Sequence, residues 1–135
     1  MSSDDITAAD VAAFLGEGAL DTLVSLFKVD PGLYALLGEL LVNPDMGVRL
    51  GAAALVEELA AVDPARRPHA AAALAPLLAA ADPVLRGDAA YLLGFVGGAV
   101  ELAGLDALTA GDPNADVREA AAEAAGKIRG RGSAA

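Results

Sequence analysis

Three segments of the chain share one spacing of apolar residues, and this repetition constrains the fold more than any other feature. The segments, 43–59, 82–96 and 112–128, each begin with Asn-Pro or Asp-Pro. They align on Arg49, Arg86 and Arg118, and the residue directly before each arginine is apolar. Counted from that apolar residue, further apolar residues or alanines stand four, seven, eight and eleven places on. In chain order these are Val48, Ala52, Leu55, Val56 and Leu59; Leu85, Ala89, Leu92, Leu93 and Val96; and Val117, Ala121, Ala124, Ala125 and Ile128. The spacing follows one face of a 3.6-residue helix, so it predicts three equivalent helices.

The distances between the repeated segments leave room for a second helix in each unit. The aligned arginines are 37 and 32 residues apart, which fits two helices and two short turns, and second helices are expected near 66–80 and 99–110. Units at 43–81, 82–111 and 112–129, with a degenerate earlier unit at 18–42, predict an all-α solenoid of about 3.5 stacked antiparallel helix pairs.

Composition supports a helical fold in a single domain. The chain of 135 residues holds 34 alanines and 21 leucines but only 5 aromatic residues. Alanine and leucine favour helices, whereas β-branched and aromatic residues favour strands. We expect one domain over 1–135, with 1–6 and 130–135 disordered.

The charge of the chain argues against two classes of partner. Nine basic residues face 19 acidic ones, giving a net charge of −10. Nucleic acids and anionic membranes are bound through rows of Lys and Arg, so neither is an expected partner. Uncharged stretches are too short to span a bilayer, and there is no cysteine. A soluble, cytoplasmic protein is expected, and the Ala-, Gly- and Arg-rich usage indicates a bacterial source.

An acid or amide stands four residues before each repeated arginine. These residues are Asp45, Asp82 and Asn114, preceding Arg49, Arg86 and Arg118 respectively. An acid at this place caps a helix N-terminus, and an arginine of the same or the next unit could bridge to it. We therefore predict a structural ladder between units. A row of arginines that binds anions is the alternative.

Motifs that carry chemistry are otherwise weak. Asp112, Asn114, Asp116 and Glu123 have the 1, 3, 5, 12 spacing of a calcium loop, but Val117 stands where that loop needs glycine, so a helix cap is favoured. His69 is the single histidine. No catalytic residue, metal site or cofactor is predicted, and the protein is not expected to be an enzyme.

The pattern of Asp-Pro, Val-Arg, Ala-Ala and Leu resembles the short HEAT-like repeats first associated with phycobilin lyases. The resemblance covers 43–129 and implies a scaffold that binds other proteins. It leaves open a tetrapyrrole-handling or bilin lyase-like role, although the chain has no cysteine and one histidine to hold a chromophore. The iron enzyme deoxyhypusine hydroxylase, which has similar repeats, binds its metal through His-Glu pairs. Here Ala70 follows His69, the single histidine, so the resemblance does not imply that activity.

The expected partner surface lies on the second helices, which usually line the binding side of such solenoids. The segment 68–80 has no acidic residue and neither Lys nor Arg, so it is either buried or covered by a partner. Candidate contacts are Arg66, Arg67 and His69 at its start, for which the alternative is a solvated turn. Tyr34 is a further candidate, for which the alternative is packing in the core. A structural homodimer is the third functional possibility. The helix at 113–129 is expected to cap the array.

Overall fold

The protein is all-α over the residues described by the computed structural model, 5–133, which contain no strand. The α-helices are α1 (Ala8–Gly16), α2 (Leu20–Val29), α3 (Leu37–Leu41), α4 (Met46–Val62), α5 (Arg67–Leu74), α6 (Pro83–Val96), α7 (Ala99–Gly111) and α8 (Ala115–Ser133). Three 3₁₀ helices, η1 (Pro31–Leu36), η2 (Pro64–Arg66) and η3 (Ala75–Ala79), connect or extend them. The predicted all-α class is confirmed. No helix within 5–133 is long and apolar enough to cross a membrane.

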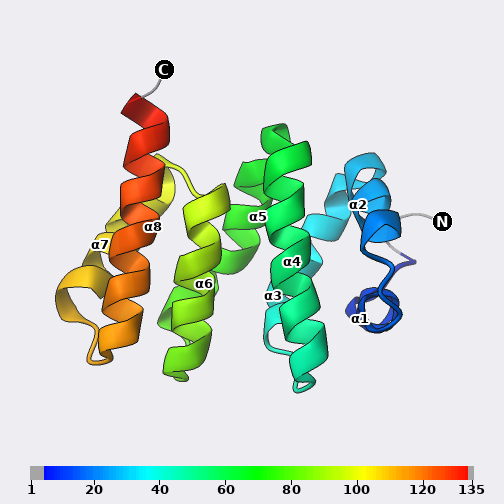
Figure 1. Cartoon of the computed structure of the whole chain (residues 1–135), viewed down its shortest axis with the longest axis horizontal. Helices are drawn as coiled ribbons and strands as arrows, with labels where there is room; N and C mark the ends of the chain where they lie inside the picture. Colours follow the sequence, from blue (N-terminus) through cyan, green and yellow to red (C-terminus); the bar gives the residue numbers. More distant parts are fainter. Residues whose placement is uncertain (1–4, 134–135) are drawn as a thin grey trace.

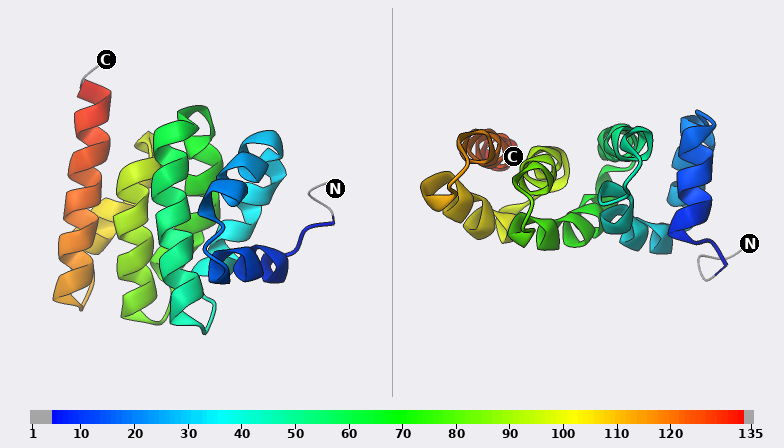
Figure 2. Two further views of the ribbon diagram at one scale, coloured as in Figure 1. Left: turned by 45° about the vertical axis from the view of Figure 1, so that its right-hand side comes forward. Right: turned by 90° about the horizontal axis from the view of Figure 1, so that it is seen from below.

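The helices form two layers. In Figure 1 the long helices α4, α6 and α8 stand side by side and run in the same direction, which makes up the first layer. Seen from below in Figure 2, η1–α3, α5–η3 and α7 form a second layer beneath them. The helices α1 and α2 lie at the N-terminal end of the row, beside α4, and α8 lies at the other end.

The three first-layer helices begin with the same cap. Asp45 Oδ1 accepts the Gly47 N–H at 2.8 Å, and Asp82 Oδ1 accepts the Val84 N–H at 2.9 Å. Asn114 Oδ1 accepts the Asp116 N–H at 2.9 Å in the same way. Each side chain satisfies a backbone donor that has no partner within its helix, so these residues fix where the helices start.

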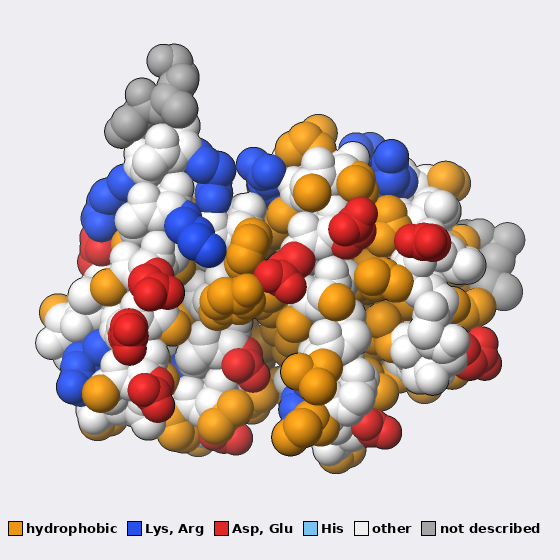
Figure 3. All heavy atoms as spheres, in the orientation of Figure 1, with side chains coloured by type: hydrophobic (Ala, Val, Ile, Leu, Met, Phe, Trp, Pro, Cys, Tyr) orange, Lys and Arg blue, Asp and Glu red, His pale blue; other side chains and the backbone are white. Residues whose placement is uncertain are grey.

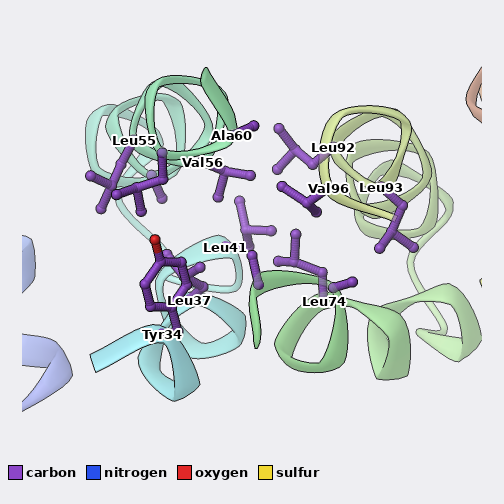
Figure 4. Close-up of a cluster of buried hydrophobic side chains, with 14 of the residues drawn as sticks. Tyr34, Leu37, Leu41, Leu55, Val56, Ala60, Leu74, Leu92, Leu93 and Val96 are labelled. Carbon is purple, nitrogen blue, oxygen red and sulfur yellow. The ribbon is translucent and has the colours of Figure 1, made fainter. Parts of the chain in front are cut away.

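The repeated apolar stripe faces the space between the layers. Of its fifteen residues all but Leu85 are buried, and Leu85 is partly exposed. Figure 4 shows Val56 and Ala60 of α4 and Leu92 and Val96 of α6 pointing toward one another, with Leu41 between the layers. Burial of these side chains is the main favourable contribution to folding.

Small residues allow neighbouring helices to approach closely. A Cβ atom added to Gly94 would lie 3.3 Å from the Ala124 Cα, so α6 and α8 are close there. A Cβ atom added to Gly38 would lie only 2.9 Å from the carbonyl oxygen of Ala73. The alanine-rich composition therefore produces close helix pairs rather than a bulky core.

Two of the expected segments differ in detail from the structure. The helix expected at 66–80 is divided into η2, α5 and η3, and α5 gives way to η3 where Pro76 has no N–H to continue the α-helical bonding. In the unit expected at 18–42, the segment after Asp30 begins as η1 and becomes α-helical only at Leu37.

The ends of the chain also differ from expectation. The helix α8 continues to Ser133, beyond the boundary at 129, and Arg131 anchors its last turns to α6. At the other end Ile6 is buried and packs in the core. The remaining residues that we expected to be disordered, 1–4 and 134–135, lie outside the described part of the chain.

Candidate binding surface

The repeated arginines hold the loops that precede their own helices. In each unit the arginine Nη1 donates to the backbone carbonyl six residues upstream: Arg49 to Asn43 at 2.6 Å, Arg86 to Ala80 at 3.0 Å, and Arg118 to Asp112 at 2.7 Å. Within residues 5–133 none of them pairs with the caps Asp45, Asp82 or Asn114. The predicted ladder is corrected in this respect, because each arginine side chain extends back to a carbonyl of the loop before its helix.

One arginine of the three also reaches the next unit. Arg86 donates from Nε and Nη2 to the two carboxylate oxygens of Asp112, at 2.8 and 3.1 Å. The equivalent contact from Arg49 would fall on Ala80, whose side chain cannot accept a hydrogen bond. These guanidinium groups are thus engaged in holding the fold, which disfavours an anion-binding row.

The structure places Tyr34 in the core rather than on the surface. Its side chain is 2% exposed, and its hydroxyl donates to Asp63 Oδ2 at 2.8 Å. Burial, reinforced by the Asp63 carboxylate, raises the pKa of Tyr34 well above its usual value. Core packing, the alternative for Tyr34, is therefore what the structure shows for most of this side chain.

The other three candidate contacts lie around the start of α5. Arg66 Nη1 lies 3.5 Å from Asp63 Oδ1. Arg67 donates from Nε and Nη2 to the Ala60 carbonyl at the end of α4, at 3.0 and 2.7 Å. His69 is exposed, with its ring centroid 6.0 Å from that of Tyr34. The structure therefore groups Arg66, Arg67 and His69 at one end of the second layer.

The outward side of the second layer, which we call the second-layer face, carries two shallow grooves. The first, of about 360 Å³, runs between η1 and α5 and is lined by Pro31, Gly32, Tyr34, Ala35, His69, Ala72 and Ala73. The second, of about 600 Å³, runs between α5–η3 and α7, and its lining includes Ala72, Ala75, Pro76, Gly104, Ala107 and Leu108. Ala72 lines both grooves, so they form one surface across η1, α5, η3 and α7.

The second-layer face is nearly free of charge. From Pro68 to Ala81 the chain has no acidic residue and neither Lys nor Arg, and α7 contributes only Glu101 and Asp106. Val100, at the edge of the second groove, is 91% exposed. Small apolar side chains in shallow grooves offer shape and apolar area to another molecule.

Basic residues gather at one end of the molecule. Figure 3 shows Lys and Arg side chains crowded where α8 ends, whereas acidic side chains are spread over the same view. Arg129 and Arg131, in the last turns of α8, line a hollow together with Arg67. Arg131 lies in the segment 130–135 that was expected to be disordered, so its place in α8 beside Arg67 was not predicted.

Residues 5–133 contain no group of three His, Asp or Glu side chains placed to hold a metal ion. The chain matches no protein-family model, no curated protein and no solved structure.

Proposed function

We propose that the protein is a HEAT-like solenoid that binds another protein through its second-layer face, without enzymatic activity. The observation that carries this proposal is the continuous, nearly uncharged surface of small residues across η1, α5, η3 and α7, in a chain with a net charge of −10. Apolar grooves rimmed by polar residues are a common feature of protein–protein contacts.

Repetition supports the proposal. The units that begin with α4, α6 and α8 share three features: the same helix cap, the same hydrogen bond from an arginine to the preceding loop, and the same buried apolar stripe. Such units hold their outward helices in a fixed relation, so the grooves are formed before a partner arrives. Preorganisation lowers the entropy lost on association.

The partner expected for this face presents apolar side chains that fill the grooves between η1, α5 and α7. The net charge of −10 repels acidic proteins at long range and favours neutral or basic ones. The partner's contact segment is accordingly apolar at its centre.

The test compares variants of the face with a matched variant on the opposite layer. Ala72 and Ala107 are exposed and line the grooves, whereas Ala54 is exposed on α4. Wild-type protein and the variants A72E/A107E and A54E are immobilised, and proteins retained from lysate of the source cells are identified by mass spectrometry. Circular dichroism checks that each variant is folded.

The proposal expects one stoichiometric protein that is retained by wild type and A54E and lost with A72E/A107E. Equal retention by all three, or equal loss from both variants, would contradict it. A visible absorption band in the eluate would favour the tetrapyrrole-handling alternative. Recovery of the bait alone, with a mass that rises with concentration for wild type but not for A72E/A107E, would identify a second copy as the occupant of the face.

A further inference from the structure

A hollow lined by arginines lies at the end of the second-layer face. It measures about 560 Å³ and is formed by the start of α5, the turn between α6 and α7, and the last turns of α8. Arg67, Arg129 and Arg131 line it, and so does one carboxylate, that of Glu101. Pro68, Val100 and Glu101 also line the second apolar groove, so the hollow and the groove are continuous. We call it the arginine hollow.

Two of these arginines are fixed without a carboxylate partner. Arg67 is held by the Ala60 carbonyl, and Arg131 donates from Nη1 to the Gly94 carbonyl at 2.5 Å and from Nη2 to the Gly97 carbonyl at 2.8 Å. Among residues 5–133 no acidic side chain forms an ion pair with either guanidinium. The Nη1 of Arg67 and the Nε of Arg131 donate no hydrogen bond to this part of the chain and remain available.

The two positive charges are close enough to oppose each other. Burial, together with the charge of Arg67, lowers the pKa of Arg131. The carbonyls at the ends of α4 and α6 offset part of the charge, since a helix C-terminus carries about half a negative charge. An anion between the guanidiniums would offset the remainder.

The other charges around the hollow leave this balance positive. Arg129 forms an ion pair with Asp106, at 2.5 Å. The Glu101 carboxylate is engaged in accepting the Gly98 N–H at 3.1 Å, which caps α7. The N-terminus of α7, whose first residues also line the hollow, adds a partial positive charge. Two fixed guanidiniums around a hollow are the arrangement that carboxylate and phosphate groups bind best.

We propose that the arginine hollow binds an oxyanion, a carboxylate or phosphate group, between Arg67 and Arg131. Because the hollow opens into the apolar groove, the carrier favoured here is an acidic side chain or C-terminal carboxylate next to the apolar segment of a bound partner. That choice of carrier rests on the proposed function, whereas the oxyanion site itself does not.

The first measurement titrates inorganic phosphate into ¹⁵N-labelled protein at low ionic strength. Saturable shifts are expected at the amides of Gly97, Gly98 and Val100 and at the Arg131 Nε–H. Losing a charge-assisted hydrogen bond should weaken binding about 10-fold or more in R67Q and in R131Q. R66Q is the matched control, because Arg66 lies in the same turn but does not line the hollow. It removes the same charge and should change the affinity less than about 2-fold.

A second arm distinguishes the source of the oxyanion. A short peptide with apolar residues followed by two glutamates is compared with the same peptide ending in two glutamines. Tighter binding of the glutamate peptide than of phosphate, with shifts extending to Ala72 and Ala107, would identify a carboxylate carried by a partner. Binding of phosphate alone would identify a free anion as the ligand.

Two results would overturn the proposal. One is the absence of saturable shifts around the hollow with both probes. The other is an equal loss of affinity in R66Q and in the folded R67Q variant, which would reduce the effect to net charge. Either result leaves the comparison of A72E/A107E with A54E unaffected, so the two proposals fail independently.

Discussion

Arg86 and Asp112 form a two-pronged ion pair that joins consecutive units, with Nε–Oδ2 and Nη2–Oδ1 distances of 2.8 and 3.1 Å. The residues are 26 positions apart, and both side chains are largely withdrawn from solvent. Arg86 also donates to the Ala80 and Ala81 carbonyls, and Asp112 accepts the Asn114 N–H. A single side chain therefore holds the loops before α6 and α8 in register.

Acid should weaken this link. The hydrogen bonds from Arg86 hold the pKa of Asp112 below its usual value. A carboxyl group whose pKa is lowered by folding stabilises the folded protein above its unfolded pKa of about 3.9, and the contribution is lost as pH falls through the folded value.

The melting temperature of D112N should therefore be several degrees lower than that of wild type at pH 7, and the difference from wild type should shrink below about pH 4. E119Q removes an exposed acid from the same helix, and it should follow the wild-type curve across this range. Parallel curves for wild type and D112N would contradict the assignment.

Tyr34 and Tyr91 provide a matched pair of hydroxyl groups. Each donates to a carboxylate at 2.8 Å, Tyr34 to Asp63 and Tyr91 to Glu57, but Tyr34 is 2% exposed and Tyr91 44% exposed. Removing the buried hydroxyl leaves a buried carboxylate short of a partner, so Y34F should lower the free energy of unfolding by about 1.5–3 kcal/mol. Y91F should change it by less than about 0.5 kcal/mol, because water replaces the lost donor. Urea unfolding measures both values, and equal losses would show that burial does not set the difference.

Two glycines should respond to alanine in opposite directions. At Gly38 the added methyl group would lie 2.9 Å from the Ala73 carbonyl oxygen, so G38A forces α3 away from α5 and should destabilise the protein by about 1–3 kcal/mol. At Gly126 nothing lies within 4 Å, and alanine favours a helix more than glycine does. G126A should therefore stabilise the protein by about 0.5–1 kcal/mol. Thermal unfolding of both variants tests the close approach of the second-layer helices, and a stabilised G38A would exclude it.

The helices and their buried faces were predictable because they depend on local spacing. The stripe from Val48 to Leu59, for example, is set by the 3.6-residue period alone, and all five of its residues are buried. Asp45, Asp82 and Asn114 followed from the same logic, since a cap is read from its distance to the helix it starts.

The contacts of the arginines and the position of the arginine hollow could not be predicted from the sequence. Arg86 finds Asp112 only because stacking brings the loop before α8 against α6, and neither Arg49 nor Arg118 has an acid at the equivalent place. Arg131 was assigned to a tail because glycines surround it, yet its bonds to the Gly94 and Gly97 carbonyls need a position that only α6 supplies. Interactions between units thus depend on the geometry of packing, which no local pattern records.

The helix α8 was predicted to cap the array, and its removal tests how the units share their stability. Deleting 113–135 removes the buried side chains of Val117, Ala121, Ala124, Ala125 and Ile128 and uncovers the side of α6 that faces them. The truncated protein should melt at a lower temperature and self-associate, because repeat arrays need a polar terminal unit. Deleting only 130–135 removes the Arg131 hydrogen bonds but none of these apolar side chains, and it should lower the free energy of unfolding by about 1–3 kcal/mol without changing the oligomeric state. Calorimetry with sedimentation measures both effects. A monomeric, equally stable protein after the longer deletion would show that α8 contributes nothing to the array.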